Sequence, residues 1–255
     1  MHFEEFAEGK SYIHSLDPRI KIAGLVPFIL VVALTSKLQV SLLAVIAGIT
    51  LVLFSRINFI ALLKRLYAVN IFILFLWLIL PFTIPGRKFL ALGALKASYE
   101  GIFYTLNITL KANAIILCTI ALVGTTPIFR IAHALRCLKI PEKLVYLFFF
   151  SYRYITVLHE EYDSLNRAMK MRAFKPRTNL HTYKSYANLI GILLVRSYDR
   201  SQRIYQAMLC RGFKGKFPAL SSFRTNKRDF AFLIFMLLFT IFLIMVETEN
   251  FFRVL

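Results

Sequence analysis

Long apolar runs constrain this chain more than any other feature of its sequence. The clearest is FAFLIFMLLFTIFLIMV at 230–246, which holds no charged residue and is flanked by Lys227-Arg228 and Glu247. A bilayer core about 30 Å thick requires roughly 20 apolar residues, because each helical residue advances the chain about 1.5 Å. Of the 255 residues, 58% are hydrophobic and 18% charged, whereas soluble domains carry about 25% charged residues. The sequence therefore predicts an all-α integral membrane protein.

The apolar runs predict about five transmembrane helices. Their expected ranges are 20–35, 38–54, 66–84, 102–123 and 230–246. Lys and Arg precede the first span and recur in 55–65, whereas the hairpin between the first two spans carries only Lys37, so the positive-inside bias predicts a cytoplasmic N-terminus. The basic loop 85–100 opposes this orientation. The start, MHFEEFAEGK, is acidic where a signal peptide is basic, so we expect no cleaved leader.

The positive charge is concentrated in one stretch. The chain has 32 Lys and Arg against 13 Asp and Glu, and residues 127–230 hold 20 of the former and 6 of the latter. On a membrane protein this indicates a cytoplasmic segment near anionic lipid, which we favour over nucleic-acid binding. Apolar residues recur there at spacings of three and four, which predicts a short helix near 128–138 and long amphipathic helices at about 142–173 and 183–211. The predicted domains are a membrane bundle (1–126), a cytoplasmic helical region (127–228) and a last membrane helix (229–255).

A short motif occurs twice in that cytoplasmic region. AMKMRAF stands at 168–174 and AMLCRGF at 207–213, each followed by Lys and each at the expected end of a long helix. Helix capping explains a glycine past the end and an arginine in the last turn. Capping does not explain why Ala-Met precedes and Phe-Lys follows at the same spacing in both copies, so we weigh it against docking to a partner. An arginine offers a planar fork of donors to carboxylates or carbonyls, and two such tips suit a dimer.

Four stretches resemble the transmembrane T component of energy-coupling factor (ECF) transporters, most closely its cobalt/nickel branch, the CbiQ type. They are SYIHSLDPRIK (11–21), TTPIFRIAHALRCLKIPEKL (125–144), FFFSYRYITVLHEEY (148–162) and LLVRSYDRSQRIYQAMLCRGFKG (193–215). The resemblance implies a scaffold in the prokaryotic cell membrane. It would link two ABC-type ATPase subunits to a small substrate-binding membrane subunit, and the repeated motifs would dock into the ATPases.

The resemblance also assigns residues. It implies that Arg172 and Arg211 are the docking arginines, supported by Ala168, Ala207 and Gly212. Ala173 stands where the family usually has glycine, which leaves the geometry of the first helix end open. Further candidates for a structural or coupling role are Arg153, Glu160, Arg196, Arg200 and Arg203. For Arg153 and the pair Glu160-Glu161 we favour salt bridges within one helix over a hinge. Lys111, inside the fourth span, either marks a substrate path or has a side chain that snorkels or faces the protein interior beside Asn107 and Asn113, and we favour the latter.

Nothing in the sequence indicates catalysis by this chain. The Walker A pattern GxxxxGK[ST] is absent, so we expect no cofactor in this subunit and expect partner ATPases to bind ATP and Mg²⁺. The five histidines (His2, His14, His133, His159 and His181) stand apart, and the three cysteines form no CxxC, so no metal site is expected. An intramembrane enzyme would require paired His, Asp or Cys. A stand-alone transporter would show broken, Gly-rich spans, and a T component shared among vitamin transporters remains the nearer alternative.

Overall fold

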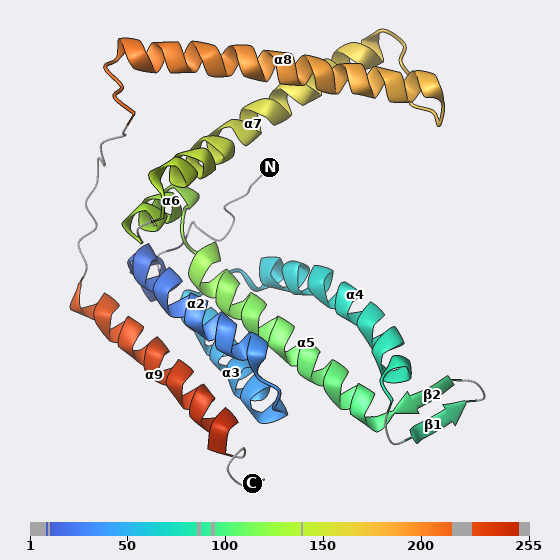
Figure 1. Ribbon diagram of the computed structural model, residues 1–255, viewed down its shortest axis with the longest axis vertical. Helices are drawn as coiled ribbons and strands as arrows, with labels where there is room; N and C mark the ends of the chain where they lie inside the picture. Colours follow the sequence, from blue (N-terminus) through green and yellow to red (C-terminus); the bar gives the residue numbers. More distant parts are fainter. Residues whose placement is uncertain are drawn as a thin grey trace. The chain divides into compact units, whose positions relative to one another are not determined.

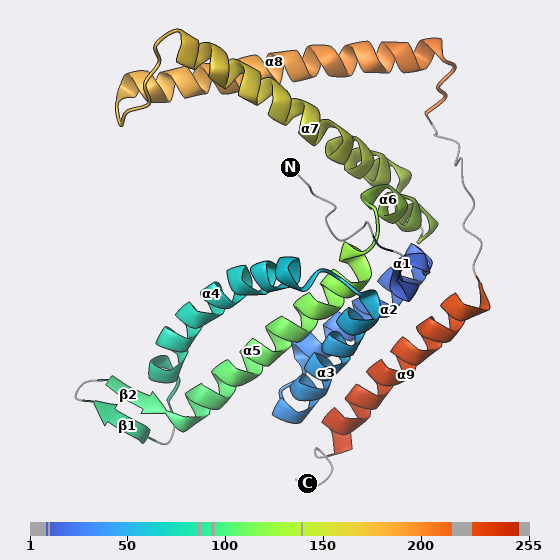
Figure 2. The same cartoon turned by 180° about the vertical axis from the view of Figure 1, so that it is seen from behind.

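A computed structural model describes residues 9, 11–85, 88–92, 95–138, 140–215 and 226–249. These form two compact units: residues 1–138 with 223–255, termed the membrane unit, and residues 139–222, termed the arm unit. The elements are α1 (Tyr12–Ser15), α2 (Pro18–Leu34), α3 (Leu38–Ser55), α4 (Phe59–Thr83), β1 (Lys88–Leu92), β2 (Leu95–Ser98), α5 (Tyr99–Thr119), the π-helix η1 (Ile120–Gly124), α6 (Ile128–Cys137), α7 (Glu142–Met171), α8 (Leu180–Cys210) and α9 (Lys227–Glu249). Figures 1 and 2 show the labelled helices from opposite sides.

The all-α prediction is confirmed, with one local exception. The predicted loop 85–100 contains a two-stranded antiparallel hairpin in which Lys88 pairs with Ser98 and Leu92 with Leu95. Within the described part of the chain, four helices are long and apolar enough to cross a membrane: α3, α4, α5 with its π-helical end, and α9. The first of the five predicted spans forms α2, which has 17 residues and is not one of these four helices. The orientation of these helices in the membrane stays a prediction.

Side-chain caps fix where α2 and α4 begin. Asp17 accepts a hydrogen bond from the backbone N–H of Arg19 (3.0 Å), and Pro18 supplies the first residue of α2. Asn58 caps α4 in the same way through the N–H of Ile60, so that helix starts well before the apolar run at 66. The predicted third span is therefore longer at its N-terminal end than its hydropathy indicated.

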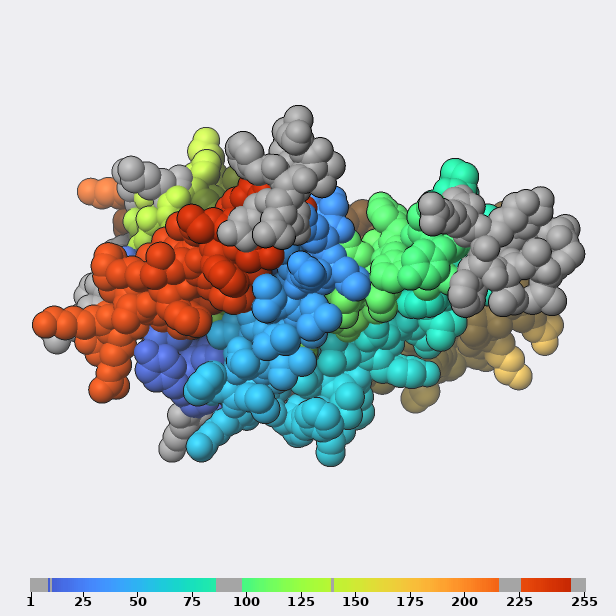
Figure 3. Space-filling model, turned by 90° about the horizontal axis from the view of Figure 1, so that it is seen from below, coloured from blue at the N-terminus to red at the C-terminus, as the bar shows by residue number. Residues whose placement is uncertain are grey.

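The core of the membrane unit lies where α2, α3, α5 and α9 meet. Its fully buried side chains include Phe28, Val32, Val40, Leu122 and Leu243. Gly48 allows α3 to approach α5 closely, because a Cβ there would lie 2.9 Å from Cβ of Leu117. The space-filling view shows α9, orange to red, against the blue helices α2 and α3 (Figure 3).

Polar side chains join these spans at specific points. Asn70 and Asn113 exchange hydrogen bonds between α4 and α5 (3.0 and 3.1 Å), and Asn107 donates to the carbonyl of Ser36 (2.8 Å). Lys111 donates to the carbonyl of Ala33 near the end of α2 (3.2 Å) in an exposed hydrogen bond, so its side chain contacts a neighbouring helix without being buried. Such bonds are expected in a bilayer, because a polar group facing lipid has no water to pair with.

The turn that leads out of the bundle is held by a buried lysine. Lys21 on α2 is 1% exposed, and its Nζ donates to Oγ1 of Thr126 (2.9 Å) and of Thr125 (3.4 Å). These threonines follow η1 and precede α6. Asp229 of α9 accepts from the backbone N–H of Asp17 (3.2 Å), so α2, α9 and the start of α6 are tied together. Sequence reasoning missed this cluster, although Lys21, Asp17 and Asp229 are charges at span ends.

Candidate functional site: the ends of α7 and α8

The arm unit consists of two long helices joined by a short connection. The predicted ranges 142–173 and 183–211 correspond to α7, with 30 residues, and α8, with 31. Asn179 caps α8 by accepting from the N–H of Thr182 (2.9 Å), which starts the helix three residues earlier than predicted. The first motif ends α7 and the second ends α8. Because an α-helix rises about 1.5 Å per residue, the two motifs are separated by roughly the 46 Å length of α8.

Both helix ends adopt the same capping geometry. At the end of α7 the N–H of Phe174 donates to the carbonyl of Met169 (3.2 Å) and that of Ala173 to Lys170 (3.1 Å). At the end of α8 the N–H of Phe213 donates to the carbonyl of Met208 (3.0 Å) and that of Gly212 to Leu209 (2.9 Å). These paired bonds define a Schellman motif. The motif places Arg172 and Arg211 at the C-cap position, directly after the last residue of each helix.

The residue after each arginine adopts the left-handed backbone conformation. Gly212 has φ +78° and Ala173 has φ +57°. Glycine adopts this conformation without steric cost, whereas an L-residue with a Cβ pays about 1–2 kcal/mol. The question that Ala173 raised is therefore answered: the first end has the same geometry as the second, built with a less favourable residue.

The Schellman geometry also corrects the sequence interpretation of the repeat. In such caps an apolar residue in the last turn frequently contacts the second residue past the helix, and the repeated Met and Phe occupy these two positions. Met169, Phe174, Met208 and Phe213 are all partly buried. Capping therefore accounts for Met, Phe and the small residue, contrary to our expectation that it could not. It does not account for Ala or for the arginine side chain.

The remaining motif residues face solvent at both ends. Ala168 and Arg172 on α7 are exposed, as are Ala207 and Arg211 on α8. In each pair the residues are one turn apart and lie on the same face. Neither guanidinium makes a hydrogen bond or ion pair with any residue that the structure describes. Each end thus offers an unengaged cation beside a small residue, a surface that a partner can approach closely.

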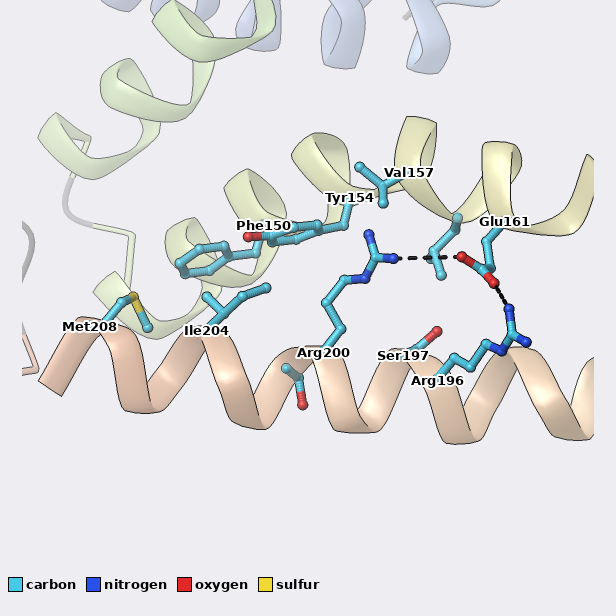
Figure 4. Close-up of a pocket in the computed structure, with 11 residues that line it drawn as sticks. Phe150, Tyr154, Val157, Glu161, Arg196, Ser197, Arg200, Ile204 and Met208 are labelled. Atoms are coloured by element: carbon cyan, nitrogen blue, oxygen red, sulfur yellow. Dashed lines mark hydrogen bonds and ion pairs between the residues drawn. The ribbon is translucent and has the colours of Figure 1, made fainter. Parts of the chain in front are cut away.

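The helices cross where Glu161 of α7 meets two arginines of α8. Its carboxylate pairs with Arg196 and, at 3.6 Å, with Arg200 (Figure 4). The carboxylate-bearing side chain is 21% exposed, whereas those of Arg196 and Arg200 are 55% and 39% exposed. The expected salt bridging within α7 is thus wrong for Glu161, because its partners belong to the other helix. The spacing of Arg196 and Arg200, one turn apart, was the signal that sequence reasoning missed.

An apolar hollow lies beside this crossing. It has a volume of about 370 Å³ and includes Phe150, Tyr154, Val157, Ile204 and Met208. Figure 4 shows the aromatic side chains of α7 facing Ile204 and Met208 of α8. The crossing and the second motif therefore share Met208, which lies one turn before Gly212.

The other candidates are less constrained. Arg153, Glu160 and Arg203 are exposed on α7 and α8, and their proposed coupling role stays a prediction. His159 lies 3.6 Å from Asp163 one turn along α7. In the described part of the chain no three or more His, Cys, Asp or Glu residues are grouped to hold a metal ion. His2 and Pro218 lie outside the described residues.

Comparison with known proteins decides the family. The family model CbiQ, described as cobalt transport protein, matches residues 9–222, which is most of the chain and includes both motifs. The chain belongs to the CbiQ/EcfT family. The resemblance found in the sequence is thereby confirmed at the family level.

The relatives of this CbiQ/EcfT member come from bacteria and archaea. It is 28% identical over 222 residues to the energy-coupling factor transporter transmembrane protein EcfT of Bacillus subtilis, covering 83% of this chain and 84% of the relative. The protein of the same name from Leuconostoc gelidum is 28% identical over 252 residues, covering 90% and 91%. An uncharacterized protein of Methanocaldococcus jannaschii is 25% identical over 251 residues, covering 96% and 86%.

Proposed function

We propose that this chain is the transmembrane scaffold and energy-coupling subunit of an ECF-type importer. In this role it links ATP hydrolysis by two ATPase subunits to a substrate-binding membrane subunit. Family membership supports the general role, because relatives that match most of the chain are named as transmembrane proteins of energy-coupling factor transporters. One structural observation carries the more detailed proposal: two helix ends with one capping geometry each present an exposed arginine.

The arrangement suits a partner that offers the same binding groove twice. Arg172 and Arg211 are held at fixed points by identical caps, so each can enter an equivalent groove with its guanidinium toward carboxylates or backbone carbonyls. Ala168 and Ala207 leave room for the groove wall one turn before. The separation of roughly 46 Å along α8 requires two grooves on a partner of at least that width, as in a pair of ATPase subunits.

The chemistry of ATP belongs to the partners in this proposal. The chain lacks the Walker A pattern, in which a glycine-rich loop and a lysine hold the phosphates. ATP and Mg²⁺ would bind to the ATPase subunits, whose closure would move the docked ends of α7 and α8. This chain then acts as a non-catalytic transmitter of movement.

For the substrate we propose cobalt or nickel ions, selected by the substrate-binding subunit. The support is the match to a family described as cobalt transport protein. The alternative is a T component shared by several vitamin importers. Uptake of radiolabelled Co²⁺, Ni²⁺ and vitamins by host cells lacking this chain separates the two: loss of metal uptake alone supports the proposal, and loss of vitamin uptake alone contradicts it.

Copurification tests the docking. The tagged chain is coexpressed with the host's candidate ATPase subunits, extracted in detergent and isolated, and the retained ATPase is quantified for wild type, Arg172→Glu, Arg211→Glu and the double variant. We expect wild type to retain ATPase and the double variant to lose it. Retention by the double variant, or no retention by wild type, would contradict the docking role.

Arg167→Glu provides the matched control. Arg167 is an exposed arginine on α7, five residues before Arg172, and its replacement changes the net charge by the same amount. We expect this variant to retain ATPase as wild type does. If it loses ATPase equally, the overall positive charge of the arm attracts the partner, and the motifs have no special part in docking.

A further inference from the structure

A narrow apolar groove opens between α3 and α9 in the membrane unit. It has a volume of about 360 Å³. Helices α1, α2, α3 and α9 contribute its walls, which include Ile13, Phe28, Ile46, Ala47, Phe235 and Phe239. Phe28 is fully buried, and its ring stacks on that of Phe239 with 6.4 Å between centroids. The groove is therefore a formed feature of the fold with an almost wholly apolar lining.

The groove continues into a second hollow with a different character. This second hollow has a volume of about 480 Å³ and shares Tyr12, Thr50 and Phe54 with the groove. It adds Ser11, Leu53 and Arg56, so polar and charged groups appear only at this end. Together the two hollows form an amphiphilic path, with an apolar interior and a cationic mouth.

Arg56 is placed to serve a ligand at that mouth. It follows the last residue of α3 in a left-handed conformation (φ +48°), and its side chain is exposed. Among the described residues none forms a hydrogen bond or ion pair with its guanidinium. Arg56 also begins the basic segment 55–65 that the positive-inside bias predicts to be cytoplasmic. The cytoplasmic leaflet is the one rich in anionic lipids.

From these observations we propose that the groove holds an acyl chain of an anionic phospholipid, whose phosphate binds Arg56. Inside a bilayer an apolar wall gives no hydrophobic preference for one apolar occupant over another, because lipid tails are as apolar as the wall. The groove therefore favours an occupant by its shape, because an occupant that leaves space unfilled loses dispersion contacts with the wall. Selectivity must come from the charge at the mouth. This site is independent of the proposed docking of α7 and α8.

Lipid retention by the purified full-length chain tests the site. The chain is incorporated into nanodiscs of equal phosphatidylglycerol and phosphatidylcholine with matched acyl chains, transferred to detergent, and its bound lipids are counted by native mass spectrometry. We expect wild type to retain phosphatidylglycerol preferentially. Arg56→Gln should lower the affinity for phosphatidylglycerol about fivefold, the effect of one basic side chain at an anionic surface. It should lower the affinity for phosphatidylcholine less, because the choline cation of that lipid offsets the charge of its phosphate.

Two further variants separate the mouth from the groove. Lys64→Gln removes another exposed cation of the same basic segment that does not line either hollow, and it should retain lipid as wild type does. Ala47→Phe fills the groove and should reduce retention of both lipids.

Two results would overturn the proposal. One is equal retention of phosphatidylglycerol by wild type and Arg56→Gln. This comparison can be made even if Ala47→Phe fails to fold. The other is full lipid retention by a folded Ala47→Phe variant, which would show that the groove does not hold the acyl chain.

Discussion

The end of α7 and the end of α8 are built on one pattern but in different surroundings. At the first end Phe174 packs edge-on against Tyr186 (5.7 Å between centroids) and near His181, both on α8. The connection is fixed further by Thr182, whose Oγ1 accepts from the N–H of Arg177 (3.1 Å). The second end leads instead into residues 216–225, outside the described part of the chain.

The cap geometry is therefore set locally, by the residues of the motif itself. The hydrogen bonds around Arg172 and Arg211 agree within 0.2 Å, because 3.2 and 3.1 Å at the first end correspond to 3.0 and 2.9 Å at the second. Packing on the neighbouring helix was therefore not needed to set the geometry. Two ends with equal geometry should contribute equally to docking, which can be tested in several ways.

The largest effect is expected from single charge reversals. Arg172→Glu and Arg211→Glu should each weaken ATPase binding by about 2 kcal/mol or more, roughly 30-fold, because a docked partner group would be left buried without its counter-charge. Titration of purified ATPase against the chain in nanodiscs measures both. If the two losses differ by more than tenfold, the ends are not equivalent, and the surroundings of the first end decide docking.

Exchange of the left-handed residues should give the next largest effect, with opposite signs. Ala173→Gly should stabilise the end of α7 by about 1 kcal/mol, and Gly212→Ala should destabilise the end of α8 by about as much, since only glycine avoids the Cβ penalty. Hydrogen exchange at the amides of Phe174 and Phe213 reports each cap separately. If both variants change cap stability in the same direction, the positive φ at these two positions is not a source of local strain for a residue with a Cβ.

A smaller effect is expected at the crossing of the helices. Glu161→Gln removes the partner of Arg196 and Arg200, and because all three side chains are partly exposed the loss should be about 1 kcal/mol or less. Spin labels near the two helix ends should show a broader distance distribution. Glu160→Gln, at an adjacent exposed residue, is the matched control and should leave the distribution unchanged.

The smallest effect concerns pH. In α6, burial, followed by the charges of Arg19 and Arg136, lowers the pKa of His133 from its ordinary 6.5, while Asp17 opposes this. The folded chain then binds fewer protons than the unfolded chain, so stability should fall as pH drops below about 6.5.

Thermal unfolding between pH 5 and 8 measures this dependence. The decline should be weaker in His133→Gln, which cannot titrate. An equal decline in both proteins would assign it to other groups.

Periodicity predicted the helices that are long and amphipathic. Ranges for α6, α7 and α8 lie within three residues of the structure, because a continuous apolar face, with a proline or a capping asparagine just before each helix, leaves few alternatives. The positions of Arg172 and Arg211 at the helix ends followed from the same signals. Hydropathy was less accurate for α4, whose first turns carry Lys64 and Arg65, and for β1 and β2, which appeared as an unstructured basic loop.

Contacts between distant residues could not be predicted in this way. Periodicity places Glu161 on α7 but cannot say that its partners are Arg196 and Arg200, 35 and 39 positions further along. The same holds for Lys21, whose threonine partners lie 105 and 104 residues away. A charge in a sequence has many potential partners, and only the packing of the helices selects among them.

The sequence by itself determined the membrane class, the two long arm helices and the repeated cap, because each depends on residues within one or two turns of one another. Only tertiary packing selected which charges pair across α7 and α8 and how α2, α9 and the start of α6 are tied together. It also decided where a groove stays open between α3 and α9. Those features depend on how closely helices approach, and that distance is set by residues such as Gly48, where the absence of a Cβ leaves room for Leu117 far away in the chain.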